Sequence, residues 1–336
     1  MSDWRDEELE RIERALRPLR YQPRRAELEA RLDPRVESGS VRHWPVWTRF
    51  AMAAALFLTV GASVAWYLYQ RSPGWAIASA TGEVHLGTGS RLTRILRTGE
   101  HLETGSGRVL LRVGDIGDLT IEKNSLIRLL EASPDHQLVA LERGEIRASI
   151  LAPPRQFQVL TPSAKAVDLG CAYTLHVDAD GSGHLEVTMG WVSFEDRGRQ
   201  SFIPVGAACR TRKGLGPGTP YFLDAAPGFA LALEIVDFSA DPQARMAARK
   251  ALLPLARRRD ALTLWHLLSR GTLEERTVTL DRLIALAPLP VGVTRDAILN
   301  LEPDALQRLW DGLLLGPGEA WKLWGFTPLP APIVRH

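Results

Sequence analysis

The sequence predicts a mainly β domain of the sandwich, jelly-roll or β-helical class, flanked by one transmembrane helix and a C-terminal all-α domain. Three observations predict this organisation. Residues 50–70 carry no charged side chain, residues 72–235 alternate polar and apolar positions between glycines, and apolar residues from 238 onward recur at helical spacing. The 336 residues are too many for one ordinary domain. We therefore divide the chain into residues 1–49, 50–70, 72–235 and 238–336.

The composition excludes several classes of protein. Hydrophobic residues make up 45% and charged residues 24%, which argues against wholesale disorder. A formal net charge of +2 argues against a strongly basic protein that binds nucleic acid directly. The two cysteines exclude a four-cysteine zinc site or iron–sulfur cluster.

The charge-free run 50–70 has the length of a membrane span, since 21 residues form a helix of about 31 Å. Aromatic residues flank it, with Trp47 before the run and Trp66 near its end. Four arginines lie in the preceding 20 residues and one in the following 20, which places the amino end in the cytoplasm. A buried core helix and a cleaved signal sequence are the alternatives. The long charged arm ahead of the run favours an uncleaved single span.

The arm before the span, residues 1–49, predicts a short amphipathic helix. Leu9, Ile12 and Leu16 share one face of it, and Pro18 ends or kinks the pattern. This stripe either packs on a second short helix near residues 25–32 or docks a cytoplasmic protein. A metal-stabilised arm is excluded, because its lone histidine, His43, has no cysteine to share a zinc ion with.

The pattern of the region after the span predicts many short strands separated by glycine turns, with no helices between them. We expect strands near residues 77–86, 100–103, 108–113, 119–121, 126–130, 137–141, 145–151, 156–161, 166–177, 183–188, 190–195, 201–204 and 208–211.

The amino-acid sequence of this region resembles the FecR domain over about residues 77–213. The stretches that carry the resemblance include TGEHLETGSGRVLLRVGDIGDLTIEKNSLIRLL, LVALERGEIRASI, FQVLTPSAKAVDLGCAYTLHVD and LEVTMGWVSFED. One departure is Cys171, which stands where the family usually has threonine; Tyr173 keeps the family's aromatic residue.

The resemblance implies an inner-membrane, single-pass regulator with its amino terminus in the cytoplasm and its carboxyl terminus in the periplasm. Such proteins relay a periplasmic signal to a cytoplasmic sigma factor, and the implied outer partner is a periplasmic or outer-membrane protein. The family contains both inhibitors and activators of sigma factors. The arm here is shorter than the sigma-binding domain of many relatives, so a membrane-tethered periplasmic scaffold without a sigma-factor role is the alternative.

Cys171 and Cys209 both follow the predicted span and so lie on the side where thiols tend to oxidise. A disulfide between them would stabilise the fold by roughly 4 kcal/mol. The other interpretation is two small buried residues on separate strands.

The C-terminal region predicts about five helices. Asp241-Pro242 begins one, Thr272 and Glu275 form a capping box for another, and Pro303 begins a third. The first of these helices, near residues 242–259, is rich in arginine. It is either a solvated basic face or a contact for anionic lipid or an acidic partner.

The motifs of common enzymes are missing from the sequence. It contains no phosphate-binding glycine loop followed by lysine and serine, and no histidine pair at the i, i+4 spacing of a helical metal site. We therefore expect no catalytic residue, no cofactor and no metal. Two classes of function stay open, a signal-transducing regulator and an interaction scaffold, with an envelope enzyme whose site is unrecognised as a weaker third.

Overall fold

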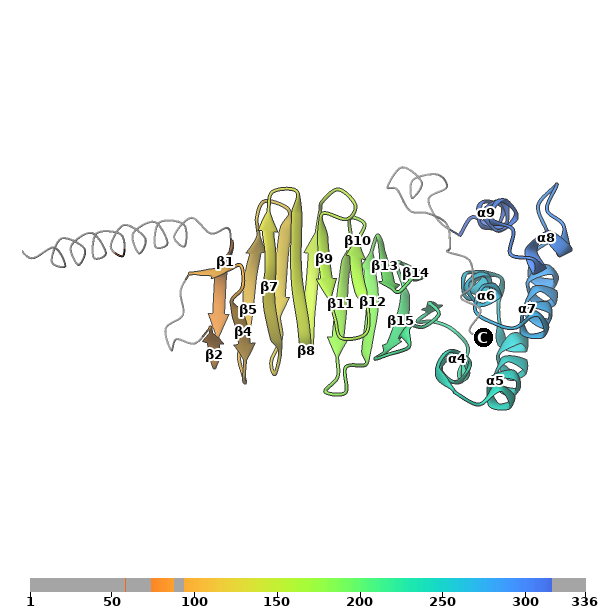
Figure 1. The fold of residues 1–336 in the computed structure, drawn as a ribbon, viewed down its shortest axis with the longest axis horizontal. Helices are drawn as coiled ribbons and strands as arrows, with labels where there is room; N and C mark the ends of the chain where they lie inside the picture. The colour runs from red at the N-terminus through yellow and green to blue at the C-terminus, as the bar shows by residue number, and fades with distance from the viewer. Residues whose placement is uncertain (1–57, 59–73, 88–93, 316–336) are drawn as a thin grey trace, which may run out of the picture. The chain divides into compact units, whose positions relative to one another are not determined.

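The computed structural model describes residues 58, 74–87 and 94–315 (Figure 1). The predicted docking residues Leu9, Ile12 and Leu16 lie outside this part, as does all of the run 50–70 except Leu58. Within the described residues, no helix is both long enough and apolar enough to cross a membrane.

The β region consists of two sheets that share one core, and their strands pair antiparallel except for the parallel pair β8 and β9. The first sheet has the order β3–β1–β5–β6–β8–β11–β12–β15, and the second has the order β2–β4–β7–β8–β9–β10–β13–β14. Side chains that alternate along the strands meet in one hydrophobic core between the sheets. The strands are β1 (Gly74–Thr81), β2 (Val84–Leu86), β3 (Ile95–Arg97), β4 (His101–Thr104), β5 (Arg108–Val113), β6 (Gly117–Ile121), β7 (Leu126–Ser133), β8 (His136–Ile150), β9 (Phe157–Leu160), β10 (Lys165–Asp168), β11 (Ala172–Val177), β12 (Gly183–Met189), β13 (Trp191–Asp196), β14 (Arg199–Pro204), β15 (Ala207–Arg212), β16 (Gly216–Pro217) and β17 (Tyr221–Phe222).

Strand β8 belongs to both sheets. Its first half pairs with β7 and β9, and its second half pairs with β6 and β11. It changes sheets at Gly144, whose φ of +91° suits glycine and few other residues. A Cβ atom there would collide with Ser125, whose hydroxyl accepts a hydrogen bond from the Glu145 amide at 2.9 Å. The sequence predicts two separate strands here, at 137–141 and 145–151. In the structure they are one strand, which bends at Gly144.

The helical region follows the sheets and contains six α-helices among the described residues. They are α4 (Phe229–Phe238), α5 (Pro242–Leu255), α6 (Ala261–Leu268), α7 (Leu273–Leu286), α8 (Arg295–Leu299) and α9 (Pro303–Gly312). The predicted caps are present: Asp241 accepts from the Gln243 amide at 2.9 Å, and Thr272 and Glu275 form the capping box. The helices begin at Phe229, earlier than the boundary expected at residue 238.

The expectation of a mainly β domain followed by helices is thus confirmed. Most strands match the predicted positions, but the strands expected at 77–86 and 166–177 are each divided between the two sheets, into β1 and β2 and into β10 and β11. Those that were not predicted, β3, β16 and β17, have three residues or fewer and too little sequence to show a period of two.

Candidate functional site at the junction of sheet and helices

The outer edge of β14 is covered by groups from the helical region. Among the described strands, β14 pairs only with β13. On its other edge, the Phe202 amide donates to Nε2 of His266 at 3.1 Å, and the Gln200 carbonyl accepts from Nη2 of Arg270 at 2.8 Å. Helix α6 and the residues after it therefore supply the hydrogen bonds that a further strand would make.

His266 is neutral and has one defined tautomer. Its Nε2 must accept from the Phe202 amide, and its Nδ1 accordingly donates to the Leu262 carbonyl at 2.9 Å. The side chain is fully buried, and this burial, aided by the positive charge of Arg270, holds its pKa well below the usual value of 6.5. Protonation would remove the acceptor that holds β14.

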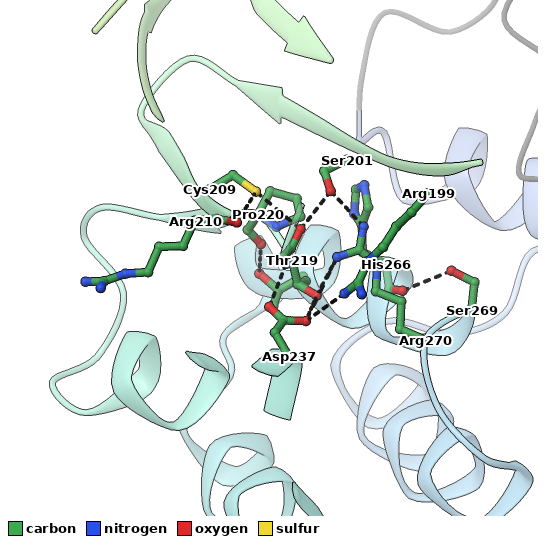
Figure 2. Close-up of polar contacts among 12 residues, drawn as sticks. Arg199, Ser201, Cys209, Arg210, Thr219, Pro220, Asp237, His266, Ser269 and Arg270 are labelled. Carbon is green, nitrogen blue, oxygen red and sulfur yellow. Dashed lines mark hydrogen bonds and ion pairs between the residues drawn. The ribbon is translucent and has the colours of Figure 1, made fainter. Parts of the chain in front are cut away.

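Arg270 and Asp237 form a buried ionic network beside this contact (Figure 2). The Arg270 guanidinium donates to Thr219 Oγ1 at 2.9 Å and to Ser201 Oγ at 2.7 Å, and it lies 4.0 Å from Asp237. Asp237 also accepts from the Thr219 amide at 2.6 Å and contacts Arg199 at 3.4 Å. Burial and the neighbouring Arg199 lower the pKa of Arg270 to about 9, so it stays charged at neutral pH.

An aromatic cluster completes the junction. Trp310 of α9 lies with its ring centroid 4.7 Å from that of Trp265 and 5.8 Å from that of Phe202, both in edge-on arrangements. Trp191 of β13 follows at 6.3 Å. The Trp265 indole donates to the Leu306 carbonyl at 3.0 Å, which ties α6 to α9. These contacts join the end of one sheet to the helices through both apolar and charged groups.

A second buried polar group lies inside the sandwich at Asp168. Its carboxylate accepts from the Gly170 amide at 2.6 Å and from the Cys171 thiol at 2.8 Å. The side chain faces the core, and burial raises its pKa from 3.8 to about 6 in spite of these two hydrogen bonds. Burial and the nearby Asp168 also raise the pKa of the Cys171 thiol. The thiol therefore stays protonated, and the pair does not make an activated nucleophile.

The two cysteines, Cys171 and Cys209, are free and buried. Cys209 lies opposite Leu185, which itself lies opposite Leu175, four residues along β11 from Cys171. Four residues of strand cover about 13 Å, whereas the Cα atoms of a disulfide lie within about 7 Å. Of the two interpretations left open by the sequence, this fold does not allow the disulfide and agrees with two small buried residues.

The sequence identified the two cysteines but missed the junction. Its polar residues come from β14, the segment before β17, α4, α6 and the segment after α6, which no local pattern connects. One signal was available: His266 is the single ionisable residue in the otherwise apolar helix ALTLWHLL. Within the described part of the chain, no group of three or more His, Cys, Asp or Glu side chains is placed to hold a metal ion.

Comparisons with known proteins support the assignment of the β region. Residues 100–193 match the family model described as FecR protein. Two solved structures that resemble the chain are each described as a candidate anti-sigma factor from Parabacteroides distasonis ATCC 8503. One is 17% identical with a TM-score of 0.33, covering 39% of this chain and 63% of the other. The second is 16% identical with a TM-score of 0.29, covering 46% and 64%.

The chain thus spans less than two thirds of the length of either structure. No curated protein matched the sequence. The family match covers 94 residues, 100 to 193, which span strands from β4 to β13. This match to the FecR family model lies inside the stretch, about residues 77–213, over which the sequence resembles that family.

Proposed function

We propose that the chain is a single-pass inner-membrane regulator that relays a periplasmic signal to a cytoplasmic sigma factor. The observation that carries the proposal is a match to the FecR family model at residues 100–193, which follows a charge-free run of 21 residues at 50–70. The cytoplasmic arm, residues 1–49, would bind the sigma factor through Leu9, Ile12 and Leu16. The sandwich and helices would bind a periplasmic or outer-membrane protein.

The junction supports the part of this proposal in which the sandwich and the helices act as a single sensing body. Because α4, the segment after α6 and β14 share the buried Arg270–Asp237 network, a partner that binds the helices would also act on the sandwich. A partner outside changes the affinity of the arm only if it binds two states of the protein with different affinities. A single span transmits a shift poorly, so regulated proteolysis or a change in oligomeric state is the relay that fits this layout.

The docking part of the proposal is tested by co-purification of the full chain with the sigma factor encoded beside its gene. We expect retention by the wild type and loss in the variant Leu9→Asp, Ile12→Asp, Leu16→Asp, because three carboxylates would interrupt the apolar stripe. The control variant, Arg11→Asp with Arg14→Asp, places aspartates on the opposite face of the predicted helix. Equal retention of the factor by both variants contradicts docking through the stripe.

The topology is tested separately by an alkaline phosphatase reporter fused after residue 72, since this enzyme is active only outside the cytoplasm. Activity of the fusion is the expected result. A silent reporter would refute the orientation. An active reporter together with no sigma-factor retention would instead favour the membrane-tethered scaffold.

A further inference from the structure

One end of the sandwich is defined by where the chain enters it. The strand register places Ala76 of β1 beside Arg112 and then Asp118, and the same row continues through Ser149 and Ala172 to Met189. Gly74, the first residue of β1, lies at this end of the row, which we call the entry end. Three segments that cross between the sheets meet there, at residues 169–171, 190 and 205–206.

The crossing segments at the entry end are joined closely by backbone contacts. The Val205 amide donates to the Gly190 carbonyl at 3.0 Å, and the Ile150 amide donates to the Cys171 carbonyl at 3.0 Å. Gly190 approaches the Gly170 carbonyl so closely that a Cβ atom would collide with it. Residues 150–151, 170–171, 189–190 and 205 therefore form one continuous rim.

This rim exposes large apolar side chains to solvent. The exposed fractions are 83% for Leu151, 51% for Met189 and 51% for Val205. None of the three is needed to fill the core. A group of exposed apolar side chains on adjoining segments marks a contact surface.

The distance from the predicted span limits what this rim can face. Residues 71–73 alone separate the end of the charge-free run from Gly74, and three extended residues reach about 11 Å. The headgroup layer on one side of a bilayer is itself about 6 Å thick. The entry end is thus held at the membrane surface by its own chain, and a weak contact there is favoured by the high local concentration that the tether creates.

We propose that Leu151, Met189 and Val205 insert into the interfacial layer of the membrane and orient the sandwich on it. This inference rests on the span in the proposed function. The contact is apolar in character. Arg259, the cationic side chain beside Gly206, pairs with Asp224 at 2.9 Å, and the nearby Arg257, which also contacts Asp224 at 3.1 Å, pairs with Asp260 at 2.9 Å. Insertion should therefore persist in zwitterionic lipid and at high salt.

The test uses the full chain reconstituted into phosphatidylcholine nanodiscs and labelled with an environment-sensitive fluorophore at Leu151→Cys or Met189→Cys. The native thiols are buried, and burial raises the pKa of Cys209 to about 12, so they do not compete for the label. Controls are Leu160→Cys and Leu215→Cys, which are 42% and 47% exposed at the opposite end of the sandwich. We expect doxyl-labelled lipid to quench the rim labels at least twofold more than the control labels.

Each other outcome overturns the proposal. Equal quenching at both ends removes the preference for the entry end. Rim labels that are shielded from iodide but not quenched by doxyl lipid show that a second copy or another protein covers the rim. A chain that does not float with vesicles lacks the span on which the proposal rests. The co-purification experiment tests only the cytoplasmic arm. If the arm does not retain the sigma factor, a positive quenching result at the rim still supports insertion.

Discussion

At the scale of single residues, Asp168 is a buried carboxyl in the core of the β region. It occupies a core-facing position where an apolar residue would be expected, and its hydrogen bonds to Gly170 and Cys171 hold the turn that carries the chain from β10 to β11. The raised pKa of Asp168, about 6, means that ionisation occurs near neutral pH and works against the fold. The contribution of the Asp168 carboxyl to the fold is therefore the pair of hydrogen bonds that fix the turn between β10 and β11.

Asp168 should make the protein less stable as the pH rises. Because its pKa in the folded state, about 6, lies above the ordinary value of 3.8, its stabilising contribution is complete below pH 3.8 and is lost by the time the pH exceeds 6. The difference corresponds to roughly 3 kcal/mol in the free energy of unfolding. About 2 kcal/mol of this loss falls between pH 4.5 and 7.5. We expect the Asp168→Asn variant to lack it when denaturant unfolding of the detergent-solubilised chain is compared at these two pH values.

The control for this experiment is Asp180→Asn, which alters an exposed turn carboxylate whose pKa is lowered by Ser182. It should leave the difference between the two pH values as in the wild type. His266 titrates with the opposite sign, losing stability as the pH falls below 6.5. The quantity to compare is therefore the difference in the free energy of unfolding between variant and wild type at each pH. If Asp168→Asn shows the same pH dependence as the wild type, the prediction is wrong.

At the scale of elements, β8 determines how the two sheets are connected. A strand that leaves one sheet and enters the other needs a sharp bend with no side chain on its inner side, and Gly144 meets both needs. The Ser125 hydroxyl, which bonds both Glu145 backbone groups, occupies the space that a side chain would take.

Gly144→Ala should be strongly destabilising, and Gly99→Ala provides a matched comparison. Both glycines have nearly the same φ, +91° and +88°, but nothing lies within 4 Å of a Cβ atom built at Gly99. Gly99→Ala should cost about 1–2 kcal/mol for the left-handed backbone alone. Gly144→Ala adds the collision with Ser125 and should cost several kcal/mol in all, measured as a shift in the denaturation midpoint. Equal shifts would show that the packing against Ser125 is not limiting.

The elements differ in how well the sequence predicts them, for physical reasons. Strands such as β5 and β11 alternate buried and exposed residues without interruption, so their period identifies them. Helix α4 was not separated from the β domain, because Phe229, Leu231, Leu233 and Ile235 recur every second residue as in a strand. Of these, Leu231 and Ile235 are exposed in the helix. The period of two in this segment therefore arises from leucine and isoleucine side chains on the protein surface. The sequence alone does not distinguish these from apolar side chains in the core.

At the scale of the whole molecule, the sandwich and the helical region share one buried charge network. This was beyond sequence reasoning, because Arg270 and its partner Ser201 are far apart in the chain and are adjacent only after both regions have folded. A buried guanidinium and carboxylate with several hydrogen bonds are costly to separate, since either partner alone would be an uncompensated buried charge. We therefore expect the two regions to unfold together.

Arg270→Met should lower the free energy of unfolding by about 3 kcal/mol and split the single thermal transition into two. Adding Asp237→Asn should recover part of this loss, because it removes the carboxylate that Arg270→Met leaves behind. The exposed Arg258→Met serves as a control and should leave one transition. Two transitions in the wild type would contradict the shared network as the source of cooperativity.

The covering of β14 has a wider consequence. Any related sandwich that lacks the helical extension would leave the amide at the position of Phe202 and the carbonyl at the position of Gln200 open to an extended peptide from elsewhere. Such a relative would have to recruit a ligand strand, carry a proline or a lysine at that border, or be prone to self-association into fibres.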